Sequence, residues 1–212
     1  MNNGRIYQDT ENRILGNLLR NPMESKSQRR IALETGLSYV TVHKIIPLLV
    51  KRNLVKLEIK GRANLILLDF EQADLSNLSS AMLFERTNLL KKHPELILLT
   101  RDIEESLSNS FYSMVIFGSY AKGDVKKNSD IDLLFIVPER RDIEKYYEKI
   151  KEVLRLYPFP KKDFQIISTK DFVDMLNQKY TVGRSVFQHG IVLFGVESYY
   201  AMVKNYVRTK GY

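Results

Sequence analysis

The sequence predicts an α+β protein built in two parts, and three observations support this fold class. Residues 9–50 carry apolar side chains at helical spacing, and residues 54–68 follow with a hairpin-like pattern. Two short apolar runs, residues 112–117 and 133–137, are rich in β-branched and aromatic residues, which is typical of buried strands. The excess of basic residues lies in the first third of the chain.

Composition excludes several classes of protein. The 212 residues, 44% of them apolar, are enough to bury one good core or two small ones. The absence of cysteine excludes disulfides, thiolate metal sites and thiol catalysis. The first residues lead into a polar stretch, so no signal peptide is expected, and no run approaches the roughly 18 apolar residues of a spanning helix. We therefore expect a soluble, cytoplasmic protein that does not bind membranes.

The formal net charge of +8 is unevenly distributed. Residues 1–69 hold 12 Lys and Arg against 6 Asp and Glu, whereas the remaining residues hold 21 against 19. This difference predicts a module that binds a polyanion, attached to a nearly neutral body.

Three helices are expected in the N-terminal part. The first covers residues 9–20, and the second covers residues 27–34 and ends at Gly36 in a C-cap role. Ser38 can cap a third helix, whose spacing predicts a buried face. That face consists of Val42, Ile45, Ile46, Leu49 and Val50.

A β-hairpin is expected next, because residues 54–59 and 64–68 alternate or run apolar around Gly61. Three short helices followed by a hairpin resemble the winged helix-turn-helix, and residues 33–38 resemble its turn, where Gly36 permits the reversal. In that resemblance the third helix would lie in the major groove of duplex DNA.

The resemblance implies two groups of DNA contacts from residues 1–69. The third helix would present Tyr39, Thr41, His43 and Lys44, while phosphates would be met by Arg29, Arg30, Lys60 and Arg62. Two alternatives stay open: winged helices also serve as protein–protein modules, and basic residues often form no more than a solvated face.

The middle of the chain is expected to connect the two parts of the protein. Residues 70–79 lack clear periodicity and are interpreted as a linker, and helices fit about 80–92 and 94–107. These helices could bridge two domains or pair with a second subunit, so a homodimer stays open. The expected partition is a winged helix-turn-helix domain at 1–69, a linker with a connecting helix at 70–93, and a catalytic domain at 94–212.

The two strand-like runs bracket a group of residues suited to phosphate chemistry. Gly118 follows the first run and opens a short helix, where free N–H groups and the Ser119 hydroxyl can face a phosphate. Gly123 is expected to let this turn pack close to the sheet. Asp130 and Asp132, two positions apart, point to the same face of a strand. Two such carboxylates repel unless a cation lies between them, and Mg²⁺ favours oxygen ligands of this kind.

Taken in order, Gly118-Ser119, Gly123 and the segment 129–133 (Ser-Asp-Ile-Asp-Leu) resemble the signature of the polymerase β-like nucleotidyltransferase superfamily. The similarity is closest to its minimal nucleotidyltransferase branch, where the turn commonly reads Gly-Ser-x-Ala-Arg-Gly. Here Lys122 stands where that arginine is frequent, which keeps the positive charge and loses the planar fork. The motif covers residues 115–137. The resemblance implies a nucleotidyltransferase-type α/β domain with a small mixed sheet.

A third acid follows the amphipathic helix expected at about 141–155. Residues 163–168 form another strand-like run that opens with Asp163. In the resembled family a third carboxylate at this point completes the metal site. The alternative is an acid at a strand end, balanced by Lys161 and Lys162. The remaining residues, about 169–209, are expected to form helices on either side of residues 190–195, an element that packs on the sheet and carries no chemistry.

The resemblance implies Mg-dependent transfer of a nucleoside monophosphate from a nucleoside triphosphate to an acceptor hydroxyl. The catalytic and metal-binding residues would be Asp130, Asp132 and Asp163, holding two Mg²⁺ ions, and the nucleotide would be bound by Gly118, Ser119 and Lys122. The alternative is a DNA-binding regulator or an antitoxin, whose transferase domain senses nucleotide or binds a protein partner such as a toxin without catalysis.

Overall fold

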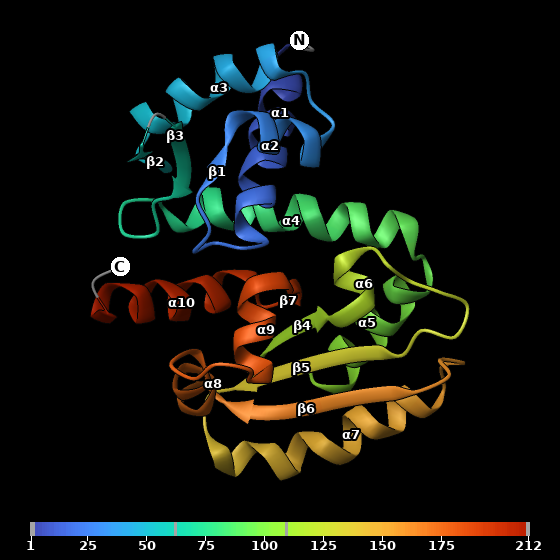
Figure 1. Ribbon diagram of the computed structural model, residues 1–212. Helices are drawn as coiled ribbons and strands as arrows, with labels where there is room; N and C mark the ends of the chain where they lie inside the picture. The colour runs from blue at the N-terminus through green and yellow to red at the C-terminus, as the bar shows by residue number, and fades with distance from the viewer. Residues whose placement is uncertain (1–2, 62, 109, 211–212) are drawn as a thin grey trace. The chain divides into compact units, whose positions relative to one another are not determined.

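The structure, a computed structural model, describes residues 3–61, 63–108 and 110–210 (Figure 1). The chain divides into two compact units, with boundaries between Glu85 and Arg86 and between Met202 and Val203. The first unit therefore contains the N-terminal part and the end of the last helix, and the second unit contains the residues between. The partition expected from the sequence placed its boundaries at residues 69 and 93 and assigned the whole C-terminus to the second part.

The first unit begins with three helices and a small antiparallel sheet. The helices are α1 (Asn3–Leu19), α2 (Gln28–Thr35) and α3 (Tyr39–Lys51). The strands are β1 (Lys26–Ser27), β2 (Val55–Lys60) and β3 (Ala63–Leu68), in the order β1-β3-β2. The expected second and third helices and the hairpin are confirmed, whereas β1 is too short to leave a pattern in the sequence.

Polar caps fix the starts of α2 and α3; the sequence indicated the cap at Ser38, whereas it placed Ser27 inside the second helix. The Ser27 hydroxyl accepts a hydrogen bond from the backbone N–H of Arg30, and the Ser38 hydroxyl accepts one from Thr41. Gly36 ends α2 with a φ of 65°, a conformation that glycine adopts without a steric penalty. The turn between α2 and α3 is therefore determined locally by the sequence.

Two long helices each belong partly to the first unit and partly to the second. Helix α4 spans Leu75–Lys92 and α10 spans Val196–Lys210, and both unit boundaries fall inside them. Since α4 starts at Leu75, half of the expected linker is helical. In the part of the chain that the structure describes, no helix combines the length and the apolar character that a membrane span requires.

The second unit is organised around a four-stranded mixed sheet. Its strands are β4 (Ser113–Phe117), β5 (Ile131–Val137), β6 (Lys162–Ser168) and β7 (Ile191–Phe194). They lie in the order β6-β5-β4-β7, with β5 and β6 parallel and the other pairs antiparallel. Most residues of β4 and β5 are buried, as the apolar runs predicted: Leu133, Leu134 and Phe135 have no exposed surface.

The helices of the second unit lie around this sheet (Figure 1). They are α5 (Glu95–Ser106), α6 (Gly118–Lys122), the 3-10 helix η1 (Arg140–Asp142), α7 (Ile143–Arg155), α8 (Thr169–Leu176) and α9 (Val182–His189). Helix α7 packs on β6 and α5 through Tyr146, Ile150 and Leu154. The combination of helices with a small mixed sheet is the α+β class expected for this part.

Residues 190–195 were expected to pack on the sheet between helices, and no secondary structure was assigned to them. In the structure Ile191–Phe194 form β7, which pairs with β4 at the edge of the sheet. Four consecutive apolar residues are too few to separate strand from helix by periodicity. Gly195 bends the chain out of the strand at a φ of 71°, where an added Cβ would lie 2.4 Å from the carbonyl oxygen of Tyr112.

Candidate active site

Three carboxylates meet at one end of the four-stranded sheet. Strand β4 ends there, and β5 and β6 both begin there, because they run antiparallel to β4. In the register of the sheet Asp132 lies opposite Asp163 on the parallel neighbour β6. Asp130 precedes Asp132 by two positions and so belongs to the same face. The structure thus brings together Asp130, Asp132 and Asp163, which we call the acidic cluster.

The charges of the acidic cluster act on one another. Burial raises the pKa of Asp132, and the nearby Asp163 and Asp130 carboxylates raise it further, while Lys161 opposes the shift. The Lys161 ammonium lies 3.8 Å from Asp130 Oδ2 and 4.0 Å from Asp163 Oδ2. The three carboxylates and Lys161 together therefore carry a net negative charge when all four groups are ionised.

Gly118 makes room for the central acid. Its φ is 66°, and an added Cβ would lie 2.0 Å from Asp132 Oδ2, a separation that no packed atoms can have. In the register of β4 and β5, Phe117 is paired with Asp132, so the next residue passes directly over the carboxylate. The sequence assigned Gly118 to a phosphate-binding turn and did not reveal this approach, because 13 residues separate it from Asp132 and the register was unknown.

The other members of the glycine turn lie beside this contact. Ser119 follows Gly118 in α6 and is partly exposed, and Lys122 is exposed at the end of the helix. Gly123 ends α6 with a φ of 80°, and an added Cβ there would meet nothing within 4 Å. The expectation that Gly123 allows close packing on the sheet is therefore wrong. Its left-handed conformation is what favours glycine.

The donor atoms of the acidic cluster suit a hard divalent cation. Mg²⁺ prefers carboxylate oxygens, and mutual repulsion among the three acids is relieved by a cation. In the described residues, however, no three Asp, Glu or His side chains are gathered into one group that could hold a metal ion. The residues fit the ion by chemistry, and their carboxylates would have to converge further to share one.

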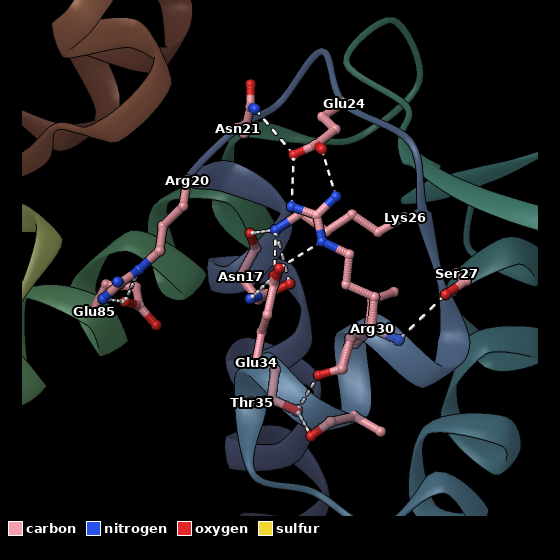
Figure 2. A network of polar contacts seen from close by, with 12 residues as sticks. Asn17, Arg20, Asn21, Glu24, Lys26, Ser27, Arg30, Glu34, Thr35 and Glu85 are labelled. Carbon is pink, nitrogen blue, oxygen red and sulfur yellow. Dashed lines mark hydrogen bonds and ion pairs between the residues drawn. The ribbon is translucent and has the colours of Figure 1, made fainter.

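The predicted DNA-contacting residues fall into two sets in the first unit. Arg30 belongs to a polar network (Figure 2): its guanidinium bonds Glu24 at 2.5 Å and Glu34 at 2.6 Å. These carboxylates raise the pKa of Arg30, and a phosphate contact would have to compete with both. The i to i+4 spacing of Arg30 and Glu34 was a signal for this pair that sequence reasoning missed.

The second set is exposed. Tyr39, His43 and Lys44 are exposed on α3, Thr41 is partly exposed there, and Arg29 is exposed on α2. The Tyr39 and His43 rings stack with centroids 5.9 Å apart, and His43 Nδ1 lies 3.0 Å from Gln28 Oε1. Lys60 ends β2, but its side chain and the whole of Arg62 lie outside the described residues.

The fold and the acidic cluster define a class of protein: an α+β protein with a glycine turn beside carboxylates, an arrangement suited to phosphoryl or nucleotidyl transfer. Residues 89–182 match a family model described as a nucleotidyltransferase domain. The matched segment contains Gly118 and the whole acidic cluster. This region, somewhat less than half of the chain, is therefore similar to nucleotidyltransferase domains. No curated protein matches the chain, and no solved structure does.

Proposed function

We propose that this protein is a Mg-dependent nucleotidyltransferase that moves a nucleoside monophosphate from a nucleoside triphosphate to an acceptor hydroxyl. The observation that carries the proposal is the position of Asp132: it lies between two other carboxylates and directly under Gly118. Three acids with an unmatched charge destabilise a fold unless a cationic ligand binds them. The match to a nucleotidyltransferase domain agrees with this assignment.

The residues of the site have separate tasks in this proposal. Asp130, Asp132 and Asp163 would hold two Mg²⁺ ions, which neutralise the phosphate charge that develops during transfer. The turn at Gly118 and the Ser119 hydroxyl would bind the β- and γ-phosphates, and Lys122 would add a positive charge beside them.

The transfer exchanges one phosphoester bond for another. The acceptor hydroxyl attacks the α-phosphorus, the bond to the bridging oxygen breaks, and pyrophosphate leaves. Asp163, the most exposed of the three acids with 52% of its side chain accessible, would orient the hydroxyl and accept its proton. A covalent enzyme intermediate is not required.

Labelling with nucleotides tests this function. The full chain is incubated with each of the four α-labelled nucleoside triphosphates, Mg²⁺ and cell extract, and the labelled product is identified. We expect label on one acceptor and none with Asp130→Asn combined with Asp132→Asn. Absence of label with every nucleotide, under conditions where the protein is folded, would instead support a regulator or antitoxin that uses the domain without catalysis.

We further propose that the first unit is a winged helix-turn-helix that binds duplex DNA. Its element order, the exposure of Tyr39 and Lys44 on α3 and of Arg29 on α2, and the basic excess of residues 1–69 support this proposal. Arg30 is omitted, because Glu24 and Glu34 already bind its guanidinium.

DNA binding by the full chain can be tested through its dependence on salt. Each lost phosphate contact lowers the slope of log K against log salt by about 1. We expect that loss with Arg29→Gln, whereas Arg30→Gln leaves the slope unchanged. Equal binding of DNA by the wild type and by a variant lacking Arg29, Tyr39 and Lys44 side chains would contradict the module assignment.

A further inference from the structure

Lys161 is held beside the acidic cluster by a backbone hydrogen bond and by ion pairs of its side chain. Its carbonyl oxygen accepts a hydrogen bond from the N–H of Ile131 at 3.0 Å, which fixes the start of β6 beside the start of β5. Lys161 precedes Asp163 by two positions, so the two side chains leave the strand on the same face. The lysine is thus placed by the register of the sheet, since Ile131 and Lys162 are register partners.

The ammonium group of Lys161 lies between two acids that come from different strands. It is 3.8 Å from Asp130 Oδ2 and 4.0 Å from Asp163 Oδ2, and it lowers the repulsion acting on Asp132. Within the described residues, the same carboxylates do not form a three-ligand group for a metal. A monovalent cation supplied by the chain therefore occupies the region where a divalent ion would neutralise these acids.

We propose that Lys161 is a built-in counter-cation that holds the acidic cluster together before a metal ion binds and is displaced from it when the ion arrives. This inference rests on the proposed metal-dependent function. A divalent ion and an ammonium compete for the same carboxylate oxygens, because the two cations repel each other at short distance and use the same lone pairs. Since 66% of the Lys161 side chain is exposed, it can swing into solvent without breaking a packed core.

An ordinary surface ion pair is the competing explanation. Exposed pairs of this length contribute little to stability, and such a pair would leave metal affinity unchanged apart from a general effect of net charge. The neighbouring Lys162 separates the two explanations. It carries the same charge one position away, and on a strand it points to the opposite face.

Calorimetric titration with Mn²⁺ or Mg²⁺, without nucleotide and at about 0.15 M salt, tests the proposal on the full chain. Lys161→Met removes the competing cation, and we expect it to bind the metal about fivefold more tightly than the wild type. Lys162→Met is the matched control and should stay within about twofold. Lys161→Arg, which keeps a cation at this position, should return the affinity toward that of the wild type.

Thermal unfolding supplies a second measurement that does not depend on activity. Without metal, Lys161→Met should unfold at a lower temperature than the wild type, because three acids then lack a counter-charge. Saturating Mg²⁺ should remove that difference, while the Lys162→Met variant should show no such metal-dependent change.

Each result decides between the explanations. Equal or weaker metal binding by Lys161→Met, or an equal gain in Lys162→Met, overturns the counter-cation proposal and leaves the metal site intact. If neither the wild type nor Lys161→Met binds a divalent ion, the proposed metal-dependent function itself is wrong, and with it the basis of this inference. Loss of metal binding in Asp130→Asn with Asp132→Asn identifies the heat as coming from the acidic cluster.

Discussion

The two units each contain a cluster of charged side chains, and the clusters are built in opposite ways. In the first unit, Glu24 and Glu34 are matched by Lys26 and Arg30, with Asn17 between them; we call this the paired network (Figure 2). In the second unit, the three acids of the acidic cluster face Lys161 alone within their group. Matched charges stabilise a fold, whereas an excess of one sign is retained where a ligand must bind.

The pKa shifts of the two clusters have opposite signs. Burial alone would raise the pKa of Glu34, but hydrogen bonds from Lys26, Asn17 and Arg30 outweigh it and lower the pKa to about 2. Burial also raises the pKa of Asp132, and there the neighbouring acids add to the shift instead of opposing it. The difference lies in the partners, because desolvation acts in the same direction on both carboxylates.

The largest effect is expected from substitutions that remove the charge of the acidic cluster. Asp130→Asn combined with Asp132→Asn should abolish nucleotidyl transfer, because the carboxylates proposed to hold the metal ions are gone. The same change removes like charges and should leave the protein as stable as the wild type or slightly more stable without metal. Transfer rates and thermal midpoints with and without Mg²⁺-nucleotide measure both effects. Unchanged transfer by the double variant would refute the assignment of these residues.

The second prediction concerns the glycine over Asp132. Gly118→Ala should reduce transfer by several orders of magnitude, because the new methyl group would meet Asp132 Oδ2 and displace it. Gly123→Ala is the matched control: its φ is also positive, but its Cβ would enter open space. Both variants should lose about 1 kcal/mol of stability from the left-handed conformation. Equal activity of the two variants would show that the close approach does not matter.

The third prediction tests the paired network. Lys26 is 4% exposed, and its ammonium donates to Glu34 Oε2 at 2.7 Å and to the Asn17 carbonyl oxygen at 3.0 Å. Lys26→Met removes the ammonium from both acceptors, although Glu34 keeps its hydrogen bonds from Asn17 and Arg30, so we expect a loss of about 2 kcal/mol in the free energy of unfolding. Denaturant unfolding measures the loss. The control Lys51→Met, in the exposed last turn of α3, should change it by less than about 0.5 kcal/mol.

The sequence predicted features that depend on neighbouring residues, and it did not predict contacts between residues that are far apart in the chain. The sequence predicted β4, β5 and β6, the cap at Ser38 and the order of glycine and acids, because each depends on neighbouring residues or on a short repeat in the sequence. The contact of Gly118 with Asp132 was not predicted, since it depends on how two strands align. The position of Lys161 between Asp130 and Asp163 depends on the same alignment. The sequence therefore left two interpretations of Asp163 open: a catalytic carboxylate, or an acid whose charge is balanced by a neighbouring lysine.

The partners of Arg30 show the same limit in the first unit. A basic residue on an exposed helix reads as a DNA contact, and only the fold reveals that Glu24, six positions away across β1, reaches its guanidinium. Charge counts predicted the basic character of residues 1–69 and could not say which of those charges are already matched.

The smallest expected effect is the dependence of stability on pH, and it sharpens the comparison between the clusters. Since the folded pKa of Glu34 lies near 2, below its ordinary 4.5, its stabilisation is present above pH 4.5 and is lost as the pH falls toward 2. The folded pKa of Asp132 lies above its ordinary 3.8, so its ionisation destabilises the fold as the pH rises through the window that begins at 3.8.

Two single variants separate these effects. At pH 7 Glu34→Gln should be less stable than the wild type by about 1 kcal/mol, a value reduced by solvent screening, whereas Asp132→Asn should be slightly more stable. Both differences should shrink as the pH falls to 2, because Asp132 is then protonated and Glu34 is being protonated at its folded pKa of about 2. Unfolding free energies from pH 2 to 7, without metal, test the signs. A loss of stability in Asp132→Asn at pH 7 would mean that its carboxylate is matched like those of the paired network, and the contrast between the two clusters would fail.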